Sequence, residues 1–124
     1  MSFHLASADL NLVQCSFVLT PKPGLIDEVC AELSELAKDI EDKQPGTLSF
    51  SVLKAVPIKE MGTDGPETVV VNVICRDRDS AAAHRESPEI KAFLAKGKAE
   101  GKLACPPEMR AIFPIGGYIR QPLK

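Results

Sequence analysis

The chain of 124 residues contains few aromatic side chains. It has no tryptophan and one tyrosine, and aromatic residues make up 5% of the sequence. Proteins that bind single-stranded nucleic acid stack the bases on aromatic side chains, and phosphate-backbone binding needs an excess of positive charge. Here 15 basic residues stand against 17 acidic ones, which gives a net charge of −2. We therefore expect no nucleic-acid partner.

The sequence also lacks the common motifs for metals and cofactors. Its four cysteines, at positions 15, 30, 75 and 105, are far apart and form no Cys-x-x-Cys pair, which argues against a zinc site or a redox motif. The glycine-rich loops that bind nucleotides and the His-Glu-x-x-His zinc motif are missing as well. We expect neither a metal nor a cofactor, and we expect the cysteines to be buried thiols in a reducing compartment.

Long apolar segments are the third absence. The N-terminus has no basic start and no apolar run of signal-peptide length, and the valine run at 69–71 is far too short to span a bilayer. We expect a cytoplasmic protein without membrane contact. The length fits one domain, residues 12–124, preceded by an N-terminal arm, residues 1–11, that shows no clear period.

What the sequence does contain is a regular succession of strand and helix patterns. Alternating apolar residues predict strands at 12–19, 47–56, 67–76 and 109–119, the last bent at Pro114 and Gly116-Gly117. Apolar residues at three- and four-residue spacing predict helices at 25–43 and 87–102. A short alanine-rich helix at 77–86 is expected between the last two strands, capped by Asp79 or Ser80. The first helix is acidic and the last one basic.

The order β-α-β-β-α-α-β is that of an α+β, ferredoxin-like fold with an antiparallel sheet and helices on one face. The other face of such a sheet still carries apolar side chains that need a cover. In so short a chain we expect that cover to be a second copy, which gives a two-fold homodimer.

Several short segments occur in an order that is characteristic of one family. They are Lys22-Pro23-Gly24, Pro45-Gly46-Thr47-Leu48, Val69-Val70-Val71, Asp77, Ala81, His84, Ser87-Pro88 and Phe93. Over roughly residues 12–119 the chain thereby resembles the antibiotic biosynthesis monooxygenase (ABM) family of the dimeric α+β barrel superfamily. The resemblance implies a homodimer with a small-molecule cavity between sheet and helices in each subunit.

The family includes cofactor-independent oxygenases of anthrones and quinols, haem-degrading enzymes and processors of small signalling molecules, so the resemblance constrains fold more than chemistry. The sequence departs from the family at three places. Gln44 stands where the family often has Glu, and Val73-Ile74-Cys75 stands where it often has Glu and an aromatic residue. The tryptophan that the haem-degrading branch has near the position of His84 is missing, which argues against haem degradation.

Oxygenation without a cofactor needs a substrate that can be deprotonated to an electron-rich anion, a dry cavity and a base. His84 is the candidate base, because histidine titrates near neutral pH; the alternative is a histidine that braces the junction between the two short helices. Asn72 is the second candidate catalytic residue, as the one amide in a valine-rich strand. Its partner would be a ligand oxygen or, alternatively, a group of the protein or of a second subunit.

The remaining candidates would bind substrate. Ser49 and Ser51 share a strand face and would donate hydrogen bonds into a cavity, or else face solvent or a partner subunit. Arg76 or Arg110 would stabilise an oxyanion, or form a surface ion pair. Tyr118, the only phenol, and Phe93, on the inner face of the last helix, complete the set; His4, in the N-terminal arm, is not a candidate.

These observations favour a cofactor-independent monooxygenase acting on a small aromatic, polyketide-like or quinol substrate. The alternative is a ligand-binding or stress-response α+β barrel without catalysis, or a small-molecule isomerase, because the strand Glu and aromatic residues of the family are missing.

Overall fold

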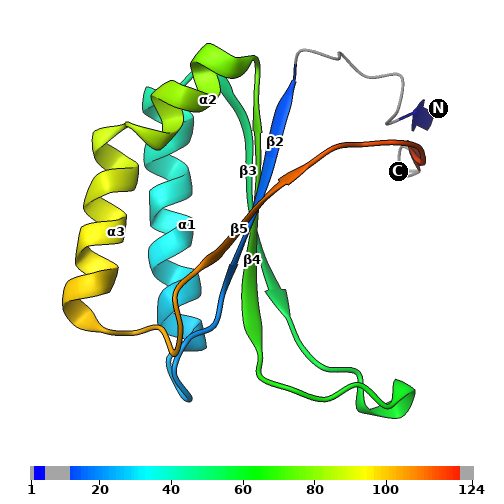
Figure 1. The fold of residues 1–124 in the computed structure, drawn as a ribbon, viewed down its shortest axis with the longest axis vertical. Coiled ribbons are helices and arrows are strands. Elements are labelled where there is room, and N and C mark those ends of the chain that lie inside the picture. The colour runs from blue at the N-terminus through cyan, green and yellow to red at the C-terminus, as the bar shows by residue number, and fades with distance from the viewer. Residues whose placement is uncertain (1, 5–11, 121–124) are drawn as a thin grey trace.

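A computed structural model describes residues 2–4 and 12–120 of the chain (Figure 1). Its centre is a four-stranded antiparallel sheet in the order β3-β4-β2-β5. The strands are β2 (Val13–Leu19), β3 (Thr47–Ala55), β4 (Thr68–Cys75) and β5 (Glu108–Ile112). The helices α1 (Ile26–Lys43), α2 (Arg78–Arg85) and α3 (Pro88–Glu100) lie together on one face of this sheet. The α+β, ferredoxin-like arrangement predicted from the sequence is confirmed.

The core lies between α1 and the middle of the sheet. The apolar stripe of α1 is buried, namely Val29, Leu33, Leu36 and Ile40, and acidic Asp27 and Glu28 occupy its first turn, where they face the positive end of the helix dipole. Every second residue of β4 is buried beneath it, from Val69 to Cys75. Because side chains alternate along a strand, the residues between them lie on the face that the helices leave open.

Two segments project from the helix-free side of the sheet (Figure 1). One is the loop between β3 and β4, with the 3-10 turn η2 (Lys59–Met61). The other is a two-stranded ribbon of β1 (Ser2–His4) and β6 (Tyr118–Arg120), paired antiparallel. Large apolar side chains on these projections are exposed, among them Met61, Phe113 and Ile115.

The structure differs from the sequence prediction mainly at the two ends of the chain. The single bent strand predicted at 109–119 is two strands in two sheets, because the chain leaves β5 after Ile112 and pairs again only from Tyr118. Within the N-terminal arm, residues 2–4 form β1, which the local pattern did not indicate; the other arm residues lie outside the described part. No helix in the described ranges has both the length and the apolar character that a bilayer crossing requires.

Candidate functional site

An apolar cavity of about 270 Å³ lies between the sheet and the helices. Leu33 and Leu36 of α1, Ile90 and Phe93 of α3, and Phe17 and Met109 of the sheet contribute to its walls. His84 is the one histidine in the wall, and its ring lies 6.1 Å from the ring of Phe50 between centroids. The structure therefore brings two of the predicted site residues, His84 and Phe93, to the same cavity.

The short helix α2 is fixed at both ends, and this positions His84. Its N-cap is Asp77, whose carboxylate accepts a hydrogen bond from the Ser80 amide at 2.8 Å; the cap expected at Asp79 or Ser80 is thus two or three residues earlier. At the other end the carbonyl of His84 accepts a hydrogen bond from the hydroxyl of Ser87 at 2.7 Å. Ser87 is also the N-cap of α3. The backbone carbonyl of His84 thus takes part in the junction between α2 and α3.

The imidazole of His84 is oriented by a chain of polar side chains. The Nε2 of Gln44 donates to the Oε1 of Glu89 at 2.9 Å. A carboxylate only accepts, so this bond fixes the Gln44 amide with its Oε1 toward His84, 2.8 Å from Nδ1. The same Oε1 accepts from the hydroxyl of Thr47 at 3.0 Å. Nδ1 of His84 therefore carries the proton, and Nε2 is the unprotonated nitrogen.

The environment of His84 keeps the ring neutral. The residue is 4% exposed, and its Nε2 has no hydrogen-bond partner among the described residues. Burial lowers the pKa of His84 below its ordinary value and the positive charge of Arg85 lowers it further, against the smaller opposing effect of the Glu89 carboxylate. A buried ring nitrogen with a free lone pair, beside an apolar cavity, is suited to remove a proton from a bound molecule.

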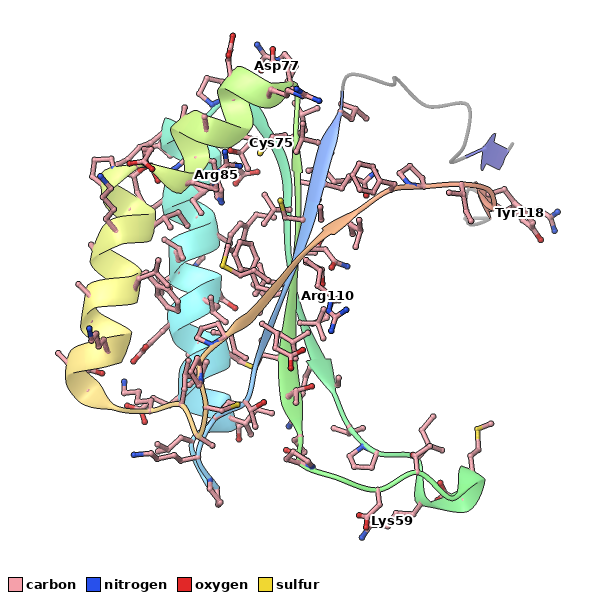
Figure 2. All side chains as sticks on the ribbon, in the orientation of Figure 1. Lys59, Cys75, Asp77, Arg85, Arg110 and Tyr118 are labelled. Atoms are coloured by element: carbon pink, nitrogen blue, oxygen red, sulfur yellow. The ribbon has the colours of Figure 1, made fainter. Side chains whose placement is uncertain are left out.

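Four other candidates lie on the opposite face of the sheet. Asn72 of β4 pairs across the strands with Ser51 of β3 and with Ser16 of β2, and Ser16 pairs in turn with Arg110 of β5. These four residues form a polar row across the helix-free face, and Figure 2 shows Arg110 on that side. The hydroxyls of Ser49 and Ser51 are 3.5 Å apart on the same face. None of these residues lines the cavity of His84.

Arg76 and Tyr118 lie apart from both groups. Arg76 is exposed, and its guanidinium donates to the carbonyl of Pro45 at 3.0 Å. Tyr118 is exposed on the projecting ribbon, with the guanidinium of Arg120 5.3 Å from the centre of its ring (Figure 2). The structure therefore does not bring these two residues to the cavity of His84.

Sequence reasoning missed Gln44, Thr47 and Glu89 as partners of His84. In the sequence Gln44 stands out only as a departure from the family pattern. A signal did exist, because Gln44 and Thr47 flank the same Pro-Gly turn and both are polar where the chain enters a strand. Within the described ranges no group of three or more His, Cys, Asp or Glu residues is arranged to hold a metal ion.

Comparison with known proteins gives a consistent fold. Residues 15–96 match the sequence model of the antibiotic biosynthesis monooxygenase family, whereas no curated protein matches the chain. Among solved structures, Rv0793 from Mycobacterium tuberculosis is 20% identical, with a TM-score of 0.66, over 83% of this chain and 94% of that one. NE2512 from Nitrosomonas europaea is 21% identical, with a TM-score of 0.64, over 94% and 100%.

A third structure is that of a protein from Bacteroides thetaiotaomicron that is named a putative antibiotic biosynthesis monooxygenase. It is 21% identical, with a TM-score of 0.63, over 85% of this chain and 90% of that one. At these identities the structural likeness establishes the fold, and the residues around His84 have to carry the argument about chemistry.

Proposed function

The chain belongs to the antibiotic biosynthesis monooxygenase family, and on that premise we propose that it is a cofactor-independent monooxygenase of a small aromatic, polyketide-like or quinol substrate. The observation that carries the proposal is that His84 lines an apolar cavity and that its buried Nε2 has no hydrogen-bond partner among the described residues. Of the described residues in that wall, His84 alone is a neutral base.

In the proposed reaction His84 removes a proton from the bound anthrone or quinol. The resulting anion passes one electron to O2, and the two radicals combine at the substrate carbon as a peroxide anion. His84 returns its proton to this anion, which gives the hydroperoxide and restores the neutral ring. Loss of water from the hydroperoxide leaves one oxygen atom in the product as a carbonyl, while the substrate C–H bond has supplied the electrons. The apolar walls exclude water, which would otherwise solvate and reprotonate the anion.

The test is oxygen uptake by metal-free protein with a panel of anthrones and quinols. We expect His84→Ala to lower the rate by about 10²- to 10⁴-fold, the usual contribution of a general base. His4→Gln, which removes the only other histidine, serves as the matched control and should keep the full rate. Absence of uptake with every substrate, or an unchanged rate in His84→Ala, contradicts the proposal.

Asn72→Ala decides which face of the sheet carries the chemistry. Because Asn72 lies on the face opposite His84, we expect its loss to leave proton abstraction intact. If Asn72→Ala abolishes turnover and His84→Ala does not, the reaction belongs to the polar row on the helix-free face instead.

A second candidate function is suggested by the composition of the cavity wall. Beside His84 the wall is apolar apart from Arg85, and a single base can also move a proton between two carbons of one molecule without oxygen. Turnover that continues under nitrogen would identify an isomerase, and saturable binding without any product would identify a ligand-binding protein.

We also propose that the protein is a cytoplasmic homodimer, joined through the helix-free face. The open face and the two projections beside it expose large apolar side chains, such as Leu53, Met61 and Phe113, and a second copy would bury them. Light scattering at micromolar concentration should give twice the chain mass, and Leu53→Lys should weaken the dimer. The four cysteines are unpaired, which suits a reducing compartment.

A further inference from the structure

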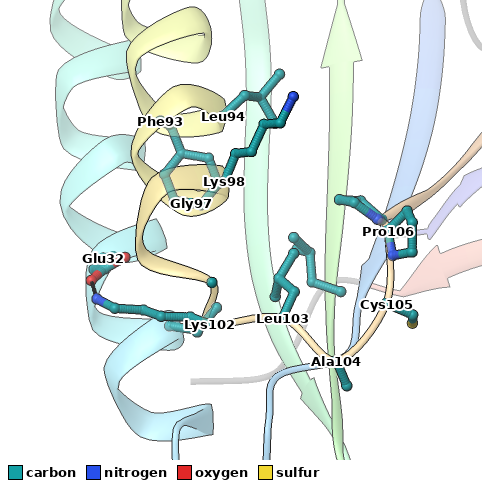
Figure 3. Close-up of a pocket in the computed structure, with 14 residues that line it drawn as sticks. Glu32, Phe93, Leu94, Gly97, Lys98, Lys102, Leu103, Ala104, Cys105 and Pro106 are labelled. Atoms are coloured by element: carbon teal, nitrogen blue, oxygen red, sulfur yellow. Dashed lines mark hydrogen bonds and ion pairs between the residues drawn. The ribbon is translucent and has the colours of Figure 1, made fainter.

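Ile90 and Phe93 lie on the stripe of α3 that faces the sheet, and at position 97, which continues this stripe at helical spacing, the residue is glycine. Gly101, one turn later, is the C-cap of the helix, and a Cβ there would meet the Nζ of Lys22 at 3.7 Å. A Cβ added at Gly97 would meet nothing within 4 Å. Under these two glycines lies a further cavity of about 530 Å³, shown in Figure 3. We call this space the glycine groove.

The glycine groove adjoins the cavity of His84. The two share four wall residues, Leu19, Phe93, Leu94 and Pro107, so together they form an elongated space along α3. The nitrogen end of the Lys98 side chain lies beside Leu94 (Figure 3), one of the shared wall residues. A molecule that extends from His84 into the groove therefore passes Lys98.

Two positive charges border the groove without an ion pair among the described residues, those of Lys98 in its wall and of Lys22, whose Nζ lies beside Gly101. Lys102 is surrounded by the carboxylates of Glu28, Glu32 and Glu100, and Lys96 pairs with Glu32 and Glu100. These contacts neutralise Glu32, the one acid in the groove wall. Lys98 forms no ion pair with any residue that the structure describes, and its side chain runs beside Leu94 on the same side of the helix (Figure 3).

We propose that the glycine groove is a second subsite, which holds the tail of the substrate and pairs its anionic end with Lys98. The inference rests on the proposed function and deepens it. The substrates are aromatic acids, with the ring system in the cavity of His84 and a carboxylate on a side chain that enters the groove and reaches Lys98. A neutral compound of the same shape fills the groove without the ion pair and binds more weakly.

The test compares two fluorescent probes that differ only in charge, 1-pyrenebutyrate and 1-pyrenebutanol. Binding is measured without oxygen, so that no turnover interferes. Wild-type protein should bind the acid more tightly than the alcohol, and added salt should reduce the difference. Lys98→Ala should weaken binding of the acid about two- to fivefold, the range of an exposed ion pair, and leave the alcohol unchanged.

Two further variants test the groove and the specificity of the charge. Gly97→Leu should abolish saturable binding of both probes, because its side chain would fill the groove, while a thermal melt confirms that the variant is folded. Lys91→Ala removes a lysine from the same helix that pairs with Glu86 and lines neither cavity, and it should change nothing. Equal effects of Lys91→Ala and Lys98→Ala, or unchanged binding in folded Gly97→Leu, overturn the proposal.

The two proposals fail separately. If the acid binds with the expected dependence on Lys98 but no anthrone or quinol takes up oxygen, the subsite stands and the oxygenase function is wrong. If compact neutral quinols are oxidised in a His84-dependent way and neither Gly97→Leu nor Lys98→Ala affects any probe, the function stands and the subsite is wrong.

Discussion

Replacing Gln44 by glutamate should raise the pKa of His84 from below its ordinary value to above it. In the wild-type protein the Oε1 of Gln44 lies 2.8 Å from Nδ1 and provides a neutral acceptor, and burial keeps the pKa of His84 below its ordinary value. Gln44→Glu puts a carboxylate in the same place with the same number of heavy atoms. The shape of the site is kept, and the charge that faces the ring changes.

The size of the effect follows from the distance. An opposite charge within about 4 to 6 Å shifts a pKa by about 1 to 3 units, and each unit is about 1.36 kcal/mol between the two protonation states. The new carboxylate would also lie against Glu89, where the amide of Gln44 now donates at 2.9 Å. Because a protonated ring relieves the repulsion between the two carboxylates, we expect the pKa of His84 to rise above its ordinary value.

The pH dependence of stability should change sign with it. In the wild type the unfolded chain binds more protons than the folded one just below the unfolded pKa of about 6.5, so the free energy of unfolding falls as the solution is acidified. In Gln44→Glu the folded state binds the proton first. That contribution to stability is then fully present below about pH 6.5 and is lost as the pH rises through the new folded pKa.

An NMR titration that detects the ring nitrogens measures the tautomer and the pKa of His84. The chain has two histidines, and His4→Gln assigns their signals. Unfolding curves at a series of pH values measure the pH dependence of stability. Gln14→Glu makes the same chemical change on the helix-free face, where Gln14 pairs with Ile74 and Ile112, and it should leave His84 unmoved. A wild-type ring protonated on Nε2, or a pKa of His84 that stays in place in Gln44→Glu, would refute the tautomer and the network from which it was inferred.

Three further predictions concern the scaffold that holds His84. Gly46→Ala should destabilise the protein by about 1 to 3 kcal/mol in chemical denaturation, because its Cβ would clash with the Oγ of Ser80, and Ser80→Gly in the same chain should restore part of the loss. Leu33→Ala should cost about 2 to 5 kcal/mol, since Leu33 is 2% exposed under the cavity. Asp77→Ala should cost about 0.5 to 2 kcal/mol by removing the cap of α2, measured by the same unfolding curves.

Two matched controls make the same change of side chain at exposed positions, and so separate the loss of packing from the change of residue type. Gly116→Ala introduces the same methyl group into open space, and Leu48→Ala shortens a leucine that is more than half exposed. Both should change the free energy of unfolding by less than about 0.5 kcal/mol. Losses as large as those of Gly46→Ala and Leu33→Ala would contradict the packing argument, and a wild-type unfolding curve for Asp77→Ala would contradict its capping role.

The sequence predicts the middle of the chain better than its ends because the middle is organised by local periods. The acidic helix and the valine-rich strand carry strong spacing signals, and both lie within one or two residues of the expected ranges. The pairing of Ser2–His4 with Tyr118–Arg120 joins segments more than a hundred residues apart. The local sequence of these two three-residue strands does not predict that they pair with each other.

The candidate site shows the same limit. His84 could be chosen from its side chain alone, because histidine titrates near neutral pH. Its partner Gln44 is 40 residues away, and Glu89 contacts Gln44 across 45 residues. The hydrogen-bonded series of side chains that sets the tautomer of His84 therefore forms only when α1 and α3 are packed. The glycines of α3 look like weak helix formers in the sequence, and only the packed structure shows that their missing side chains open a groove.

The two groups of candidate residues belong to different surfaces of one sheet. His84 and Phe93 border the cavity on the helix side, whereas the row of Asn72, Ser51 and Arg110 faces the other side. Side chains alternate between the two faces along a strand, so the backbone of the sheet and the buried valines of β4 on its helix side lie between the two groups. A small substrate that touches Nε2 of His84 therefore cannot touch Asn72 of the same chain, so these two candidates cannot act together on one molecule within a single subunit.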